Sequence, residues 1–300
     1  MARSVCFFSS YFTGNDIPLY VRIYLIELKK HVSEVILLCS NNSISEDSNV
    51  FLSDHNIALE TLKNEGFDFG MWYKAFQKYP VHEYESILLA NDSCILISEL
   101  STFFDWAKST KSDCYGLLDS VEIKHHLQSY FMLLNKTAIK ELQKYFDQHG
   151  IIKDIQLLID TYEVGFSHYL VQNGYKIQAQ YLSSDFRNEA YYNAIPLVQK
   201  GMPLIKKKII FLSYRRFEIK ELAFNNFNFD QTFYLSELKK TQDKNGFFPI
   251  SKQIEGLRPQ STLMFSIWVF AYQILGQIRK TVMKNQFLTN CFKQLKRQTN

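Results

Sequence analysis

Short apolar runs alternate with stretches of helical periodicity through the first part of the chain. The runs at 5–8, 35–39 and 86–90 each lead into polar residues, as buried strands do where they end in turns. Between them, residues 17–31 and 71–78 carry apolar side chains at helical spacing. Strands joined through helices pair in parallel, because the helix returns the chain to the same edge of the sheet. The pattern therefore predicts an α/β layer fold.

The alternation continues as far as residue 182. Residues 114–118, 130–134 and 175–182 are typical of strands. Residues 153–173 have the length and spacing of a helix, and Gly174 is placed to end it. We expect these segments to belong to the same domain as the first three strands.

The composition excludes several classes of protein. Hydrophobic residues make up 46% of the 300 residues and charged residues 21%, so a disordered chain is excluded. The net charge of +4 is too small to indicate a nucleic-acid partner. The five cysteines are scattered and form no CxxC pair, which argues against a disulfide framework and a zinc site. Only four consecutive apolar residues follow Arg3 and Ser4, too few for a signal peptide, so we expect a reducing, cytoplasmic location.

The charge changes sharply near the C-terminus. Seven of the 34 Lys and Arg side chains follow Glu255, whereas none of the 30 Asp and Glu side chains does. We expect a main domain over residues 1–210, a mixed extension over 211–255 packed on it, and a basic amphipathic tail over 256–300. Residues 263–278 are densely apolar but shorter than the roughly 20 residues that span a membrane. The tail predicts a helix lying on an anionic membrane surface; the alternative is a helix packed on the domain or on a second copy.

The segment from Asn64 to Trp72 contains the densest group of unusual residues. Gly66 and Gly70 lie four apart and allow close approach of the backbone to a ligand, while Asp68 can accept hydrogen bonds from a base or a ribose. The segment matches neither GxGxxG nor GK[ST]. Read alone, it is equally an ordinary loop at the start of a helix.

Asn91 and Asp92 follow the buried run at 86–90. The carboxyl end of a strand is where open α/β sheets bind ligands, and an Asp there can hold a divalent cation that neutralises a diphosphate. The alternative is that Asp92 only begins a turn with Ser93.

Two further segments carry candidate residues. His125 and His126 point to opposite faces of an extended segment, so one of them at most faces a given pocket. Asp160 and Glu163 share one face of the helix expected at 153–173. Each of these residues is also consistent with a structural or solvated side chain.

Near residue 206 the chain carries three consecutive lysines. Lys206 is a candidate phosphate ligand, whereas Lys207 and Lys208 are equally consistent with surface charge.

Taken in order, these segments resemble the bacterial rhamnan synthesis F family of glycosyltransferases. The resemblance covers residues 5–210 and is carried by six blocks: the helix before LKKHV, then NEGFDFGMW, LLANDSC, EIKHHLQSYF, YEVGFSHYL and GMPLIK. It implies a GT-A type, Rossmann-like nucleotide-sugar-binding fold over the main domain, with a helical C-terminal extension. The implied activity is transfer of a deoxyhexose, such as rhamnose from dTDP-rhamnose, to a lipid-linked or polysaccharide acceptor in surface polysaccharide, lipopolysaccharide or O-antigen synthesis.

The resemblance also implies roles for the candidate residues. The layout is similar to that of inverting GT-A enzymes, and this similarity implies residues that contact the nucleotide-sugar and a catalytic base. The base implied is Glu163, and Asp160 and His126 are the alternatives for the base. Asp92 would support the diphosphate, with Mg²⁺ or Mn²⁺ as its cation. The nucleotide-sugar-binding residues implied are Asn64, Gly66, Asp68, Gly70, Asn91, Asp92, His126 and Lys206.

One departure from the family layout is important. The segment Asn91-Asp92-Ser93 has one carboxylate where the usual motif has two, so a metal would be held weakly, helped by His126, or replaced by Lys206. Two other interpretations stay open: a catalytically inactive subunit serving as a membrane-associated assembly module, and a peripheral membrane scaffold. The first is motivated by the single acid, the second by the basic tail.

Overall fold

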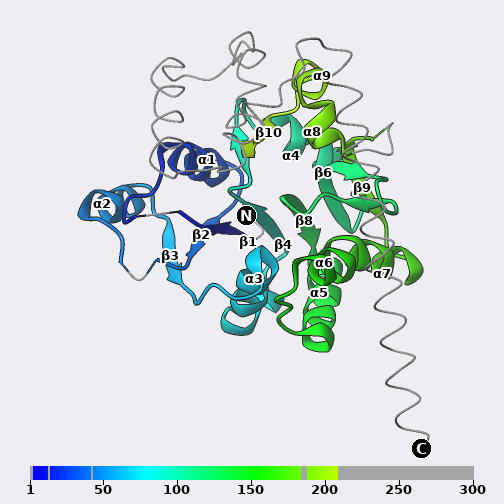
Figure 1. The fold of residues 1–300 in the computed structure, drawn as a ribbon, viewed down its shortest axis with the longest axis horizontal. Helices are drawn as coiled ribbons and strands as arrows, with labels where there is room; N and C mark the ends of the chain where they lie inside the picture. Colours follow the sequence, from blue (N-terminus) through cyan, green and yellow to red (C-terminus); the bar gives the residue numbers. More distant parts are fainter. Residues whose placement is uncertain (1–2, 13, 42, 184–187, 209–300) are drawn as a thin grey trace, which may run out of the picture. The chain divides into compact units, whose positions relative to one another are not determined.

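The computed structural model describes residues 3–12, 14–41, 43–183 and 188–208 (Figure 1). All of them belong to one unit of the chain, Met1–Phe247. The expected extension over 211–255 and the expected tail over 256–300 lie outside the described residues. No helix in the described part is long and apolar enough to cross a membrane.

A single mixed sheet forms the centre of the described part. Its order is β3-β2-β1-β4-β8-β6-β7, and β9 pairs with β6. The strands are β1 (Ser4–Ser10), β2 (Glu34–Cys39), β3 (Ala58–Thr61), β4 (Ser86–Asn91), β6 (Cys114–Ser120), β7 (His126–Leu127), β8 (Phe131–Asn135) and β9 (Ile177–Tyr181). Neighbouring strands among β1 to β4 pair in parallel, which confirms the α/β fold class.

Two strands run against the parallel direction. β8 is antiparallel to both β4 and β6, and β7 is antiparallel to β6. No helix lies between β6 and β8, and the connection is too short for a crossover, so the chain has to return antiparallel. The strand expected over 130–134 is confirmed as β8, and the sequence pattern gives it no direction.

Helices follow most of the strands (Figure 1). They are α1 (Leu19–Lys29), α2 (Glu46–Asp54), α3 (Phe67–Lys78), α4 (Ser101–Ser109), α5 (Lys136–His149), α6 (Ile155–Leu158), α7 (Phe166–Gln172), α8 (Glu189–Tyr192) and α9 (Ala194–Gln199). A second, two-stranded sheet pairs β5 (Cys94–Leu96) with β10 (Leu204–Lys206).

Helices cover both faces of the sheet, as two adjacent residues of β1 show. The ring of Phe7 packs on Phe76 of α3 at a centroid distance of 6.1 Å. The ring of Phe8 packs on Tyr24 of α1 at 5.1 Å. Successive side chains of a strand point to opposite faces, so α3 and α1 lie on opposite sides of the sheet. This double cover explains why the strands read as continuous apolar runs.

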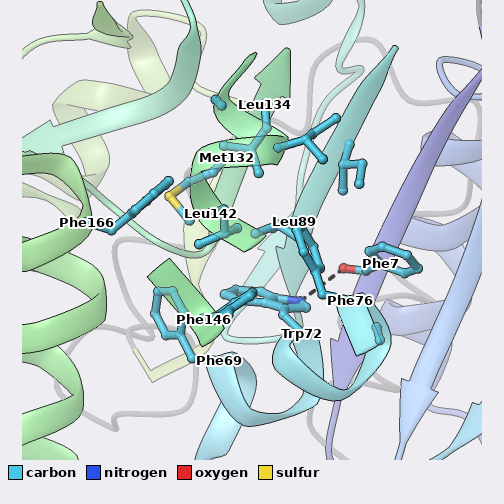
Figure 2. Packing of buried hydrophobic residues seen from close by; sticks show 14 of the residues in the cluster. Phe7, Phe69, Trp72, Phe76, Leu89, Met132, Leu134, Leu142, Phe146 and Phe166 are labelled. Atoms are coloured by element: carbon cyan, nitrogen blue, oxygen red, sulfur yellow. Dashed lines mark hydrogen bonds between the residues drawn. The ribbon is translucent and has the colours of Figure 1, made fainter. Parts of the chain in front are cut away.

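A hydrophobic core lies between the sheet and the helices α3, α5 and α7 (Figure 2). Trp72 is fully buried there, and its Nε1 donates a hydrogen bond to the carbonyl oxygen of Phe7 at 3.2 Å. Rings of Phe69, Phe76 and Phe146 surround it (Figure 2). The hydrogen bond satisfies the one polar atom of the indole, so the side chain stabilises the core without an unpaired donor.

The helix expected over 153–173 is present from Ile155 to Gln172, but it is not α-helical throughout. A π-helix, Ile159–Gly165, separates α6 from α7. The wider turn changes which side chains share a face, so Asp160 and Glu163 do not lie together as expected. Asp160 accepts a hydrogen bond from Gln156 at the surface, at 3.0 Å.

A buried carboxylate connects α1 to the start of α4. The side chain of Glu27 is 2% exposed, and its Oε1 accepts hydrogen bonds from the Leu100 backbone N at 2.9 Å and from His31 at 3.0 Å. Lys30 Nζ lies 2.7 Å from Oε2. Burial raises the pKa of Glu27, but its bonds to His31, Lys30 and Leu100 outweigh burial and lower that pKa to about 2.

Replacing Glu27 by Gln is expected to lower the free energy of unfolding at pH 7 by about 1–3 kcal/mol, because a buried set of charge-assisted bonds is lost. The folded-state pKa lies below the unfolded value of 4.5, so the stabilisation is complete well above pH 4.5 and is lost as pH falls toward 2. Urea unfolding of both proteins at pH 7 and pH 3 checks this. The exposed pair Glu85–Lys136 supplies the control, since Glu85→Gln should change the free energy by less than about 1 kcal/mol.

Candidate functional site

Polar residues gather where β1 and β4 end side by side. Ser9 of β1 pairs with Asn91 of β4, and Ser10 and Asp92 follow them. The amino end of β8 meets the same edge, since Ala90 pairs with Phe131. Apolar side chains fill both faces below this edge, so the polar groups are presented only at the strand ends.

Asp68, from the first turn of α3, bonds to both strands. Its Oδ1 accepts a hydrogen bond from Ser9 Oγ at 3.1 Å, and its Oδ2 accepts one from Asn91 Nδ2 at 2.6 Å. Burial is the main cause that raises the pKa of this carboxyl, and the nearby charge of Asp92 adds to it. The pKa is raised from 3.8 to about 6. The hydrogen bond from Ser9 and the positive charges of two lysines act in the opposite direction but do not cancel the shift.

Asp92 is the buried acid of this edge. Its Oδ2 accepts hydrogen bonds from Ser10 Oγ at 3.1 Å and from Tyr20 OH at 3.3 Å. Lys207 Nζ lies 3.1 Å from the same oxygen and also donates to Tyr20 OH at 3.1 Å. Lys207 is therefore not a surface charge: its side chain is 13% exposed, and that of Asp92 is 12% exposed.

The small sheet of β5 and β10 brings the lysines to the strand ends. Lys206 pairs with Cys94, and its Nζ donates to Ser93 Oγ at 3.2 Å while lying 4.0 Å from the ring centre of Tyr130. Burial lowers the pKa of Lys206. Neighbouring groups more than offset burial, first Cys94 and Tyr191 and then the carboxylates of Glu163 and Asp68.

Glu163 reaches the same group of charges from the π-helix. Its Oε1 accepts a hydrogen bond from the backbone N of Ser129 at 3.4 Å. Its charge acts on Lys206. Burial is the main cause that raises the pKa of Tyr130, and the charge of Glu163 adds to it. The structure thus brings Glu163, Asp68, Asp92 and Lys206, all candidates from the sequence, into one electrostatic neighbourhood.

The two glycines of the 64–72 segment are explained by packing. Gly66 has φ +77, and a Cβ there would lie 2.8 Å from the side chain of Ile151. A Cβ on Gly70 would lie 1.8 Å from the carbonyl oxygen of Glu65. Close approach is therefore to the protein's own chain, and the role of these glycines toward a nucleotide stays a prediction. Asn64 lies exposed in the loop before α3.

His126 is placed away from Asp92. It lies buried in β7, where its Nδ1 bonds to the carbonyl oxygen of Lys124 at 2.7 Å and its Nε2 lies 3.4 Å from Gln128 Nε2. β7 is three positions from β4 in the sheet, about 14 Å at the usual strand spacing. No contact between His126 and Asp92 is found in the part of the chain that the structure describes, and a role of His126 toward a metal stays a prediction.

The donor set around Asp92 does not fit a divalent cation. No group of three or more His, Cys, Asp or Glu side chains able to hold a metal is found among the described residues. A hard cation needs several oxygen ligands, but the Asp92 Oδ2 oxygen already accepts from an ammonium and two hydroxyls. We therefore derive no step through Mg²⁺ or Mn²⁺.

Three contributors were not identified from the sequence. Ser9 and Ser10 directly follow the apolar run at 5–8, so their position at the end of a strand was a usable signal. Tyr20 reaches Asp92 from α1, on the opposite side of the sheet from α3, and no sequence pattern distinguishes it from a core tyrosine.

Comparison with known protein families identifies a match. The sequence matches the family described as rhamnan synthesis protein F over residues 36–254, which is more than half of the chain. The chain belongs to the rhamnan synthesis protein F family. A search of curated proteins returned no match.

Solved structures show distant likeness. An inositol-1-phosphate CTP transferase from T. maritima is 14% identical, with a TM-score of 0.41, over 67% of this chain and 98% of that one. A cytidylyltransferase from Leptospira borgpetersenii is 8% identical, with a TM-score of 0.38, over 82% and 96%. A 4-diphosphocytidyl-2C-methyl-D-erythritol synthase from Anaerococcus prevotii is 10% identical, with a TM-score of 0.39, over 66% and 96%. All three TM-scores are below 0.5.

Asp68 should make the stability of the protein depend on pH. Its folded-state pKa of about 6 exceeds the unfolded value of 3.8, so the folded state holds the proton more tightly and loses stability as pH rises from about 4 through 6. Asp68→Asn removes this ionisation. The melting temperature of the variant minus that of the wild type is expected to increase between pH 4.5 and pH 7.5, as measured by differential scanning calorimetry. A difference that stays constant over this range would show that Asp68 does not titrate there.

Proposed function

We propose that this protein is a nucleotide-sugar-dependent glycosyltransferase of surface polysaccharide synthesis. The donor proposed is a nucleoside diphosphate deoxyhexose such as dTDP-rhamnose, and the acceptor is a lipid-linked or polysaccharide chain. Membership of the rhamnan synthesis protein F family supports the pathway class. The α/β sheet, with its candidate site at the carboxyl ends of β1 and β4, is consistent with a GT-A type domain.

The observation that carries the proposal is the combination of acids and cations at these strand ends. A diphosphate leaving group needs nearby positive charge, and Lys206 and Lys207 are held there by the β5–β10 sheet. A hydroxyl acceptor needs a base, and the Glu163 carboxylate lies in the same electrostatic neighbourhood.

The reaction proposed is direct displacement at the anomeric carbon, with inversion. Glu163 takes the proton of the acceptor hydroxyl as the oxygen attacks, and the bond to the nucleoside diphosphate breaks on the opposite side. The backbone N–H of Ser129 holds one oxygen of Glu163 in place. An inactive assembly module, the alternative reading, would bind donor without releasing nucleoside diphosphate.

Glu163→Gln is expected to reduce transfer by about 10²–10⁴-fold and to leave donor binding within a few-fold, because only proton removal is lost. Release of dTDP from dTDP-rhamnose, with bacterial membranes as the source of acceptor, measures transfer. Calorimetric titration with dTDP measures binding.

Asp160→Asn is the matched control, since that acid bonds to Gln156 at the surface and should retain transfer. If Glu163→Gln transfers at the wild-type rate, the base is another group. If the wild type binds donor and never turns it over, the inactive module is correct.

We also propose peripheral attachment to the inner face of the cell membrane through residues 256–300. Support comes from the sequence alone: seven basic and no acidic side chains surround an apolar stretch there. Attachment would keep the site near a lipid-linked acceptor.

Replacing Arg279, Lys280 and Lys284 together by Gln should reduce sedimentation with phosphatidylserine vesicles, because each lysine or arginine near an anionic surface contributes about 1 kcal/mol. Sedimentation of the wild type should also fall as salt is raised. Failure of the wild type to sediment at low salt would refute attachment.

A further inference from the structure

Two adjacent lysines at the candidate site are held in different ways. Lys207 is paired: its Nζ lies 3.1 Å from Asp92 Oδ2. Lys206 Nζ instead donates to Ser93 Oγ at 3.2 Å and lies over the ring of Tyr130, and no carboxylate of the described residues forms an ion pair with it. Lys207 is therefore held in an ion pair, and Lys206, the residue before it, is not.

This difference matters for an incoming anion. The charge of Asp92, 12% exposed, would repel a phosphate unless a cation cancelled it. In metal-dependent sites a divalent cation does this, but here the Lys207 ammonium lies on the carboxylate. An ammonium has three N–H donors. Lys206 uses one of them in its hydrogen bond to Ser93, and the ring of Tyr130 stabilises its charge without a second hydrogen bond.

We propose that the site binds a diphosphate without a metal. In this site Lys206 is the direct ligand of the diphosphate, and Lys207 is the cation that cancels the charge of Asp92. The inference rests on the proposed function for the nucleoside part of the ligand. The diphosphate chemistry of the two lysines can be tested separately.

The first experiment measures binding of two probes, dTDP and inorganic pyrophosphate, to the full chain by isothermal titration calorimetry in EDTA. Both should bind. Lys206→Met should weaken both by about 10- to 100-fold, the usual loss for a charge-assisted hydrogen bond. Lys208→Met is the matched control, because Lys208 is exposed and next in sequence, and its affinities should equal those of the wild type.

The second experiment separates the two lysines. Lys207→Met leaves Asp92 unpaired, so binding in EDTA should fall by about 10- to 100-fold, and Mg²⁺ should restore it by taking the place of the ammonium. Mg²⁺ should not restore Lys206→Met. If Lys207→Met alone is poorly folded by circular dichroism, Lys207→Met with Asp92→Asn removes both charges and should bind in EDTA as tightly as the wild type.

The outcomes distinguish this inference from the proposed function. If the wild type binds dTDP only with Mg²⁺ or Mn²⁺, and neither lysine substitution changes this binding, the inference is overturned and the proposed function still holds. If pyrophosphate binds through Lys206 and no nucleoside diphosphate binds, the inference is supported and the proposed function is refuted. Absence of binding by both probes would refute both.

Discussion

The parallel pairing of β1 with β4 is the constraint on which the candidate site depends. Because the two strands run in the same direction and in register, Ser9 lies opposite Asn91, and the polar residues that end both strands emerge together. Asp68 then bridges them through hydrogen bonds to Ser9 and Asn91. A slip of one residue in this pairing would turn the polar ends toward opposite faces of the sheet. The apolar cover on both faces therefore holds the register and, through it, the site.

The charges of the site are balanced by neighbours from distant parts of the sequence. Asp68 has a raised pKa because it is buried beside Asp92, and the lysines of β10 and of the residue after it reduce that repulsion. Such an arrangement stabilises the fold less than apolar side chains of the same size would, because charges lose hydration on burial. Retaining two acids and two lysines at one edge is understandable where a charged ligand binds and reacts.

The π-helix decides the position of the proposed base. A regular helix through Ile159–Gly165 would place Glu163 on the same face as Asp160, toward solvent. The wider turn separates them, so that Glu163 meets Ser129 while Asp160 meets Gln156. The turn is packed from inside, since Tyr145 OH donates to the carbonyl oxygen of Thr161 at 2.9 Å. A local departure from helical geometry thereby directs one of two similar acids to the site.

The sequence by itself determined the α/β class, the strands at 5–8, 35–39 and 86–90, and Asp92 at a strand end, because the apolar period and polar strand ends are local properties. Only the tertiary structure decided that Lys207 pairs with Asp92 and that β8 lies beside β4 in the sheet. These outcomes depend on contacts between residues far apart in the chain, Lys207 and Asp92 being 115 positions apart. Local spacing carries no information about such contacts, since strand order and packing bring them about.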